Sequence, residues 1–127
     1  MWIEWNNNPA GRRVGDCSVR AVSKALALTW EEAYTLLAGA GYAMGNMPSA
    51  NEVIAAVLRQ HGFYRRAIPN SCPDCYTAED FCRDFPNGTY VLAFGEHVAC
   101  VQDGAIFDSW DSSDEVPQHF WYRKDDR

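Results

Sequence analysis

Residues 97–108 read HVACVQDGAIFD and predict how the second half of the chain folds. Two apolar, β-type runs flank Asp103-Gly104, a dipeptide that favours a two-residue hairpin because both central positions of that turn need positive φ. Side chains alternate along each strand, so this register places His97 and Asp108 on one face as diagonal neighbours. Their Cα atoms are then expected about 7 to 8 Å apart, which an imidazole–carboxylate hydrogen bond can span.

Further β-type runs lie on both sides of this hairpin, bounded by glycine and aspartate. The strands predicted in this half of the chain are residues 90–94, 97–101, 105–107 and 118–123. His119 falls in the last of them and is predicted to be a strand residue. Cys100 lies on the strand face opposite His97 and is predicted to be a small core residue.

The first half of the chain has helical periodicity instead. Val19, Val22 and Leu26 recur at helical spacing after Asp16, which predicts a helix over about residues 17–28 with Asp16 as its cap. Cys17 then lies in the first turn of that helix. A carboxylate beside this thiol would raise the thiol pKa, and pointing the charge at the backbone donors of the helix start avoids this.

Three more helices are predicted from their starts. Thr29 followed by Glu32, and Ser49 followed by Glu52, match the capping box, in which a hydroxyl and a carboxylate satisfy exposed backbone donors. The helices predicted after these starts and after Thr77 are residues 30–38, 50–61 and 78–85.

Between these helices, residues 39–48 are interpreted as a loop, and Gly62 is expected to end the third helix in the left-handed conformation, with His61 as a charge-compatible helix end. The predicted fold class is therefore α+β, with a helical N-terminal half packed on an antiparallel C-terminal sheet. We predict a single domain over residues 1–127, because a chain of this size can bury one hydrophobic core.

The composition is that of a packed globular protein, with 47% hydrophobic and 22% charged residues. The formal net charge of -6 disfavours a nucleic-acid partner, since neutralising phosphates needs a basic face. The basic residues closest to Cys17 in sequence are Arg12, Arg13, Arg20 and Lys24. We interpret them as ordinary solvated charges, as we do Arg65 and Arg66, although Arg12, Arg13 or Arg20 could also offset the charge of Asp16.

Two features predict where the protein resides. No stretch approaches the roughly 20 apolar residues that span a bilayer, and the N-terminus has neither a basic leader nor an apolar run. The five cysteines, an odd number without a leader, fit a reducing compartment better than a disulfide framework. We therefore expect a cytoplasmic protein without a membrane partner.

His97 beside Asp108 is what nucleophilic catalysis requires of a base. The carboxylate fixes the imidazole tautomer and stabilises the imidazolium, so the other ring nitrogen can take a thiol proton. Among the five cysteines, Cys17 is the one predicted in the first turn of a helix. There the positive end of the helix and a nearby imidazolium lower a thiol pKa.

Three segments together resemble the motif blocks of papain-like cysteine peptidases. These segments are Gly15-Asp16-Cys17-Ser18, Glu96-His97-Val98-Ala99 and Asp108-Ser109-Trp110. The likeness spans nearly the whole chain in order and spacing, and it is greatest to small, often phage-encoded papain-like proteins.

The resemblance implies a papain-like fold, a Cys17 nucleophile, a His97 base and an orienting Asp108. It further implies that Trp110 shields the contact between His97 and Asp108 from water, that the substrate is a protein or peptide, and that no cofactor takes part. Members of the family usually place a glutamine six residues before the cysteine as an oxyanion donor. This chain has Gly11 there, so Asn6, Asn7 or Asn8 would have to substitute, and Asn8 is nearest in sequence to Cys17.

Cys72-Pro73-Asp74-Cys75, with Cys82 beyond, leaves three interpretations open. The thiols could bind structural zinc with His61 or Cys100 as a fourth ligand, form a redox pair, or have no special chemistry. Three functions follow from the whole sequence. The favoured one is a papain-like hydrolase of peptide, isopeptide or amide bonds. The alternatives are a papain-like binding module with little or no activity, and a small zinc-stabilised interaction domain.

Overall fold

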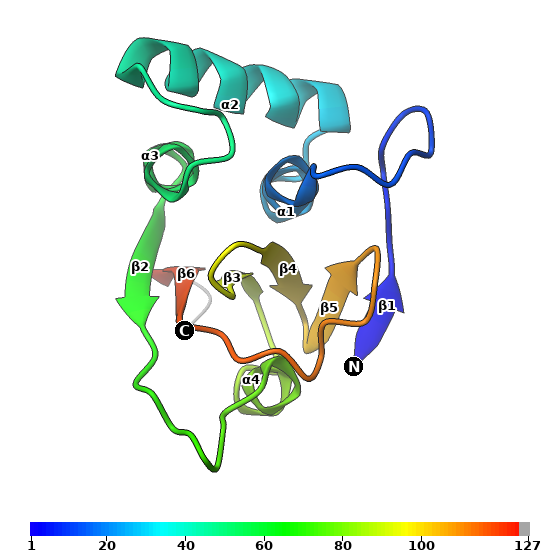
Figure 1. The fold of residues 1–127 in the computed structure, drawn as a ribbon, viewed down its shortest axis with the longest axis vertical. Helices are drawn as coiled ribbons and strands as arrows, with labels where there is room; N and C mark the ends of the chain where they lie inside the picture. Colours follow the sequence, from blue (N-terminus) through cyan, green and yellow to red (C-terminus); the bar gives the residue numbers. More distant parts are fainter. Residues whose placement is uncertain (125–127) are drawn as a thin grey trace.

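A computed structural model describes residues 1–124 of the chain, which form an α+β structure around a six-stranded sheet (Figure 1). Residues 125–127, the end of the predicted single domain, lie outside the described part. The helices are α1 (Cys17–Leu26), α2 (Trp30–Met44), α3 (Asn51–Gln60) and α4 (Ala78–Asp84). The strands are β1 (Trp2–Glu4), β2 (Phe63–Ala67), β3 (Thr89–Ala93), β4 (Val98–Gln102), β5 (Ala105–Asp108) and β6 (His119–Arg123).

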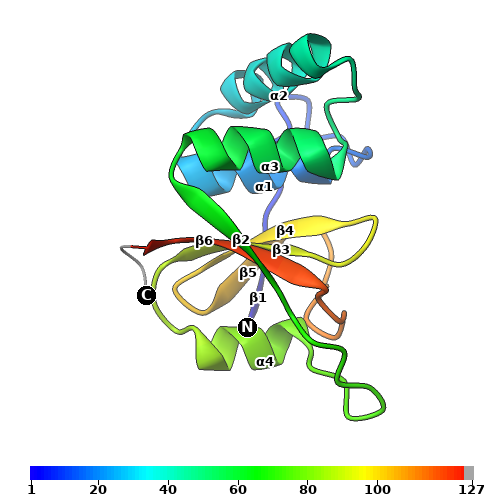
Figure 2. The same cartoon turned by 90° about the vertical axis from the view of Figure 1, so that its left-hand side faces the viewer.

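Helices cover both faces of the sheet. In Figure 2, α1 and α3 lie on one face of the sheet with α2 stacked outside them, and α4 lies on the opposite face. Alternate side chains of the central strands therefore enter two separate cores. Val91 and Cys100 pack toward α1 and α3, whereas Leu92 and Val101 pack in the core that contains α4 residues. The predicted burial of Cys100 is confirmed.

The strand order is β1-β5-β4-β3-β6-β2, and the four strands predicted from the sequence are confirmed. The hairpin is formed as predicted, with Asp103 and Gly104 at positive φ and Gln102 paired with Ala105. All the strand pairs are antiparallel except β1 with β5, which is parallel. The expectation of a purely antiparallel, C-terminal sheet is therefore wrong.

Both unpredicted strands, β1 and β2, are the edges of the sheet. Arg65 and Arg66 of β2 are solvent-exposed, as predicted for these charges, and charged side chains on an edge strand discourage pairing with other chains. β1 is only three residues long and depends on β5 for its pairing. Neither segment has the alternating apolar pattern that identifies a strand by sequence alone.

Helix boundaries differ from the prediction at several places. The capping boxes of Thr29 with Glu32 and of Thr77 with Asp80 are formed, whereas Ser49 does not cap α3, whose N-cap is Ala50. The predicted loop over residues 39–48 is wrong in its first half, because α2 continues to Met44. Gly62 has the expected positive φ of 88° after α3.

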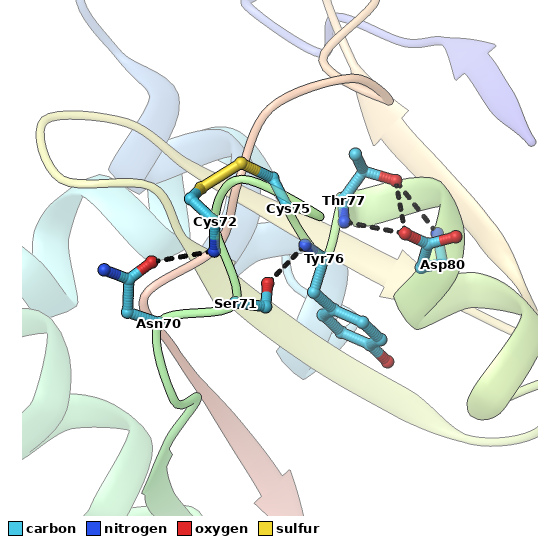
Figure 3. The surroundings of a disulfide bond; sticks show 7 residues. All are labelled: Asn70, Ser71, Cys72, Cys75, Tyr76, Thr77 and Asp80. Carbon is cyan, nitrogen blue, oxygen red and sulfur yellow. Dashed lines mark hydrogen bonds between the residues drawn. A yellow bond between two sulfur atoms is a disulfide. The ribbon is translucent and has the colours of Figure 1, made fainter.

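Cys72 and Cys75 form a disulfide in the segment between β2 and α4 (Figure 3). The Asn70 side chain accepts a hydrogen bond from the Cys72 backbone N–H, and Ser71 accepts one from the backbone N–H of Tyr76. Cys82 is a buried free thiol. The three thiols of the possible zinc site are therefore not available as a ligand set in this structure.

Candidate active site

Cys17 and His97 meet where the start of α1 passes the loop between β3 and β4. The half-buried Cys17 thiol is hydrogen-bonded to the His97 imidazole and to the backbone N–H of Val98. His97 lies one residue before β4 begins, so the strict alternation of the strand does not fix its direction. This freedom at the strand end allows the imidazole to reach a residue on the α1 side of the sheet.

The predicted contact between His97 and Asp108 is present. His97 Nε2 lies 2.6 Å from Asp108 Oδ2, which leaves Nδ1 as the ring nitrogen for Cys17. Asp108 is completely buried at the end of β5, and it also accepts hydrogen bonds from the Ser112 hydroxyl at 2.8 Å and the Ser109 backbone N–H at 2.8 Å. A buried carboxylate with this many donors is held in one orientation.

Arg20 is the fourth member of this network. Its Nη1 donates to Asp108 Oδ1 at 3.0 Å and its Nε donates to Asp16 Oδ1 at 3.1 Å. The side chain is only 6% exposed, so the interpretation of Arg20 as a solvated charge is wrong. One cation on α1 therefore pairs with two buried carboxylates, Asp16 and Asp108.

Asp16 occupies the N-cap position of α1, but its side chain does not cap the helix, which corrects the sequence prediction. Its carboxylate instead accepts hydrogen bonds from Arg20, from Trp30 Nε1 at 2.9 Å and from Asn8 Nδ2 at 3.3 Å. Burial raises the pKa of Asp16, but these bonds outweigh burial and lower it. The suggested offset of Asp16 by an arginine is confirmed for Arg20.

The network shifts the pKa values of all three predicted catalytic residues. Burial raises the pKa of the Cys17 thiol, but the His97 and Val98 hydrogen bonds outweigh it and hold the pKa below its usual range. Burial lowers the pKa of His97, and the bonds to Asp108 and Cys17 reverse this and raise it to about 9. Burial also raises the pKa of Asp108, and His97, Ser112 and Arg20 together bring it below normal. The shifts favour a thiolate beside an imidazolium near neutral pH.

Two aromatic rings flank the imidazole. Trp110 lies with its ring centroid 4.8 Å from that of His97, and Phe94 stacks on His97 at 5.9 Å. The His97 side chain is 18% exposed although Trp110 itself is 41% exposed. Trp110 thus contacts the ring as the sequence motif suggests, and its role as a shield stays a prediction. Phe94 was not among the predicted site residues.

None of the three asparagines before Cys17 is hydrogen-bonded to the thiol. Asn8 donates to Asp16, while its Oδ1 accepts from the backbone N–H groups of Ala10 and Arg12. Asn6 Nδ2 donates to the Arg12 carbonyl, and Asn7 Nδ2 donates to Ser23 Oγ. The role of Asn8 as an oxyanion donor therefore stays a prediction.

The Cys17 thiol opens into a cavity of about 390 Å³, here called the Cys17 cavity. Its polar wall residues include Ser18, Ser49, Asn51 and Glu96. A second cavity, of about 750 Å³ and here called the Trp30 cavity, shares Gly15, Ser18 and Ser49 with the first. The two cavities therefore lie next to each other at the start of α1.

Sequence reasoning missed Arg20 and Ser112 as site residues. Arg20 follows Asp16 at the i,i+4 spacing of a helical ion pair, and this spacing was a usable signal. Ser112 had no comparable signal, because its position depends on the turn after β5.

Among residues 1–124 there is no cluster of three or more His, Cys, Asp or Glu side chains placed to hold a metal ion. Within the same range, no helix is both long enough and apolar enough to cross a bilayer. Comparisons with protein-family models, with curated proteins and with solved structures gave no match to this chain.

Proposed function

We propose that this protein is a papain-like cysteine hydrolase that cleaves peptide, isopeptide or other amide bonds. The observation that carries the proposal is the continuous hydrogen-bonded chain from the Cys17 thiol through His97 to the buried Asp108. The pKa of the Cys17 thiol is lowered and the pKa of the His97 imidazole is raised, which are the shifts that this chemistry needs. The motif blocks around these residues support the assignment to papain-like enzymes.

In the proposed reaction the Cys17 thiolate attacks the amide carbonyl carbon, and the imidazolium of His97 gives its proton to the departing amine. The carbon–nitrogen bond breaks and a thioester remains on Cys17. His97, now neutral, takes a proton from water, whose oxygen attacks the thioester and releases the carboxylic acid and the thiolate. The backbone N–H of Cys17 and a side-chain amide, for which Asn8 is our candidate, would bind the oxyanion.

The test is the rate at which iodoacetamide alkylates Cys17 as a function of pH. We expect an alkylation profile whose midpoint lies well below that of an ordinary thiol, which titrates near 8.5. His97→Ala should move the midpoint up to the ordinary value, and mass mapping should locate the adduct on Cys17. An unshifted profile in the wild-type protein, or an identical profile in the variant, contradicts the proposal.

One observation favours a second candidate, a binding module without turnover. The side-chain amide of Asn8 is engaged with Asp16 rather than directed at the thiol, and loss of one oxyanion donor typically slows reaction by about 10² to 10³. Turnover of p-nitrophenyl acetate separates the two candidates. An activated Cys17 that is acylated once and never released supports the binding module.

A further inference from the structure

The Trp30 cavity is large for a surface depression of a small protein and adjoins the candidate nucleophile. Its volume of about 750 Å³ lies within the roughly 300 to 1,000 Å³ that is typical of ligand sites. Gly15 and Ser18, which flank the Asp16-Cys17 pair, belong to the walls of both cavities. A substrate whose carbonyl reaches Cys17 can therefore place a neighbouring group in the Trp30 cavity.

The walls of this cavity are mainly apolar and partly aromatic. Trp30 and Tyr34, one turn apart on α2, stack with ring centroids 5.1 Å apart and an angle of 23° between their planes. Tyr34 is 51% exposed, so part of this aromatic surface is open to solvent. The remaining apolar side chains of the wall are Pro9, Ala10, Val14, Val19 and Pro48. The β1–α1 loop, α1 and α2, which contribute most of these residues, lie on the same side of the sheet (Figure 1).

The charged group of the Trp30 cavity that is free to bind a ligand is positive. Asp16 is part of the wall, but its carboxylate is committed to Arg20, Trp30 and Asn8. Arg12 also lines the cavity, and within residues 1–124 it has no acidic side chain as a partner. The adjacent Arg13 differs, because it pairs with Glu4 at 3.3 Å and does not line the cavity.

We propose that the Trp30 cavity is a specificity subsite, which takes an aromatic side chain of the substrate together with an adjacent carboxylate. The ring would stack on the Trp30–Tyr34 surface, and the carboxylate would pair with Arg12 at the rim. The preferred substrate is thus a peptide with an aromatic residue next to an acidic group beside the reacting carbonyl. This assignment rests on the proposed function of Cys17 as the nucleophile.

Four alkylating reagents test the two parts of the subsite. Iodoacetyl-phenylalanine has the ring and the carboxylate, iodoacetyl-phenylalaninamide has the ring alone, iodoacetyl-alanine has the carboxylate alone, and iodoacetamide has neither. Dividing each rate of Cys17 labelling by the rate at which the same reagent alkylates glutathione removes differences in the intrinsic reactivity of the reagents. We expect iodoacetyl-phenylalanine to label Cys17 about tenfold faster than iodoacetamide, with a rate that saturates as its concentration rises. The rates of iodoacetyl-phenylalaninamide and iodoacetyl-alanine should lie between these two.

Matched variants assign these preferences to residues. Tyr34→Ala should remove most of the gain from the ring, and Arg12→Ala most of the gain from the carboxylate. Tyr42→Ala, at a 92% exposed tyrosine of α2 that does not line the cavity, and Arg13→Ala should leave both gains intact. Iodoacetamide rates should equal the wild-type rate in the two control variants, Tyr42→Ala and Arg13→Ala.

Equal normalised rates for the four reagents, or preferences that survive both Tyr34→Ala and Arg12→Ala, overturn the subsite. This result differs from failure of the proposed function, which appears as an ordinary iodoacetamide profile that His97→Ala does not change. The subsite is thus disproved when Cys17 is activated and shows no preference among the reagents.

Discussion

The guanidinium of Arg20 donates to the carboxylate of Asp108 at 3.0 Å, although 88 positions separate the two residues in the chain. Arg20 lies on α1, one turn beyond Cys17, and Asp108 ends β5. The bond therefore ties the helix that carries the candidate nucleophile to the group that orients the base. We regard Arg20 as a positioning residue, because it acts on Cys17 and His97 through Asp108 and through its charge.

Replacing Arg20 by methionine should destabilise the protein and raise the pKa of Cys17. Loss of the cation leaves Asp16 and Asp108 buried without their partner, and breaking such a buried pair typically costs about 3 to 5 kcal/mol of unfolding free energy. Urea denaturation measures the stability, and iodoacetamide alkylation against pH measures the thiol. Arg20→Lys keeps the charge and should restore part of the lowered thiol pKa. A folded Arg20→Met protein with the wild-type alkylation profile would exclude a positioning role.

The raised pKa of His97 predicts a pH-dependent stability. The folded state binds the His97 proton more tightly than the unfolded state, with pKa values of about 9 and 6.5. The resulting stabilisation, about 3 kcal/mol, is complete below pH 6.5 and is lost as the pH rises through about 9. Denaturation of the wild-type protein and of His97→Gln across this range measures the difference.

Cys17→Ser provides the control for this measurement. Asp108 also raises the pKa of His97, so the same direction should persist at reduced size when the thiol is removed. A stability difference between wild type and His97→Gln that stays constant from pH 6 to pH 10 would refute the shift.

The oxyanion donor can be identified because alkylation develops no oxyanion, whereas acyl transfer does. If Asn8 is the donor, Asn8→Ala should slow acylation by p-nitrophenyl acetate by about 10² to 10³ and leave the iodoacetamide rate unchanged. Asn51→Ala is the matched comparison, since Asn51 lines the Cys17 cavity at the start of α3. A large loss in Asn51→Ala with none in Asn8→Ala would transfer the role to Asn51.

The sequence predicted the local relationships of the site better than its long-range ones. Asp103-Gly104 fixed one hairpin register, and that register brought His97 and Asp108 together. Arg20 was misjudged because burial of a charge depends on where α1 lies on the sheet, which its own periodicity does not specify. Asp16 has the residue type of a helix cap, but Trp30 and Arg20 compete successfully for its carboxylate.

The edge strands also depend on long-range contacts that local sequence does not specify. β2 contains Arg65 and Arg66, and its extended conformation depends on pairing with β6 rather than on its own side chains. The extension of α2 beyond residue 38 likewise depends on a tertiary contact, the close approach of Gly41 to the α2–α3 loop. Local propensity is a weak guide where packing of this kind decides the structure.

Removing the disulfide should lower stability without affecting Cys17. A bond between residues three positions apart closes a very short loop, so its loss is expected to cost at most about 2 kcal/mol of unfolding free energy. Cys72→Ser combined with Cys75→Ser should show this cost under non-reducing conditions and react normally with iodoacetamide. Stoichiometric zinc in protein purified without chelator, together with a loss of zinc in the double variant, would instead support the metal-site interpretation.

Gly41 of α2 offers a test of the link between helix packing and the Trp30 cavity. A Cβ at this position would lie 2.8 Å from the Asn46 carbonyl oxygen and 3.1 Å from the Pro48 nitrogen, both backbone atoms. Gly41→Ala should therefore displace the α2–α3 loop, which contributes Pro48 and Ser49 to the cavity wall. We expect a loss of about 1 to 3 kcal/mol in unfolding free energy and a weaker preference for iodoacetyl-phenylalanine.

Gly39→Ala is the control, because a Cβ there meets nothing within 4 Å. Alanine replaces glycine within the same helix, so this variant should be stabilised by about 0.5 to 1 kcal/mol and keep the wild-type reagent preference. If both variants were equally stable and equally selective, the loop would tolerate the added methyl group. The close approach of Gly41 would then have no part in shaping the cavity beside Cys17.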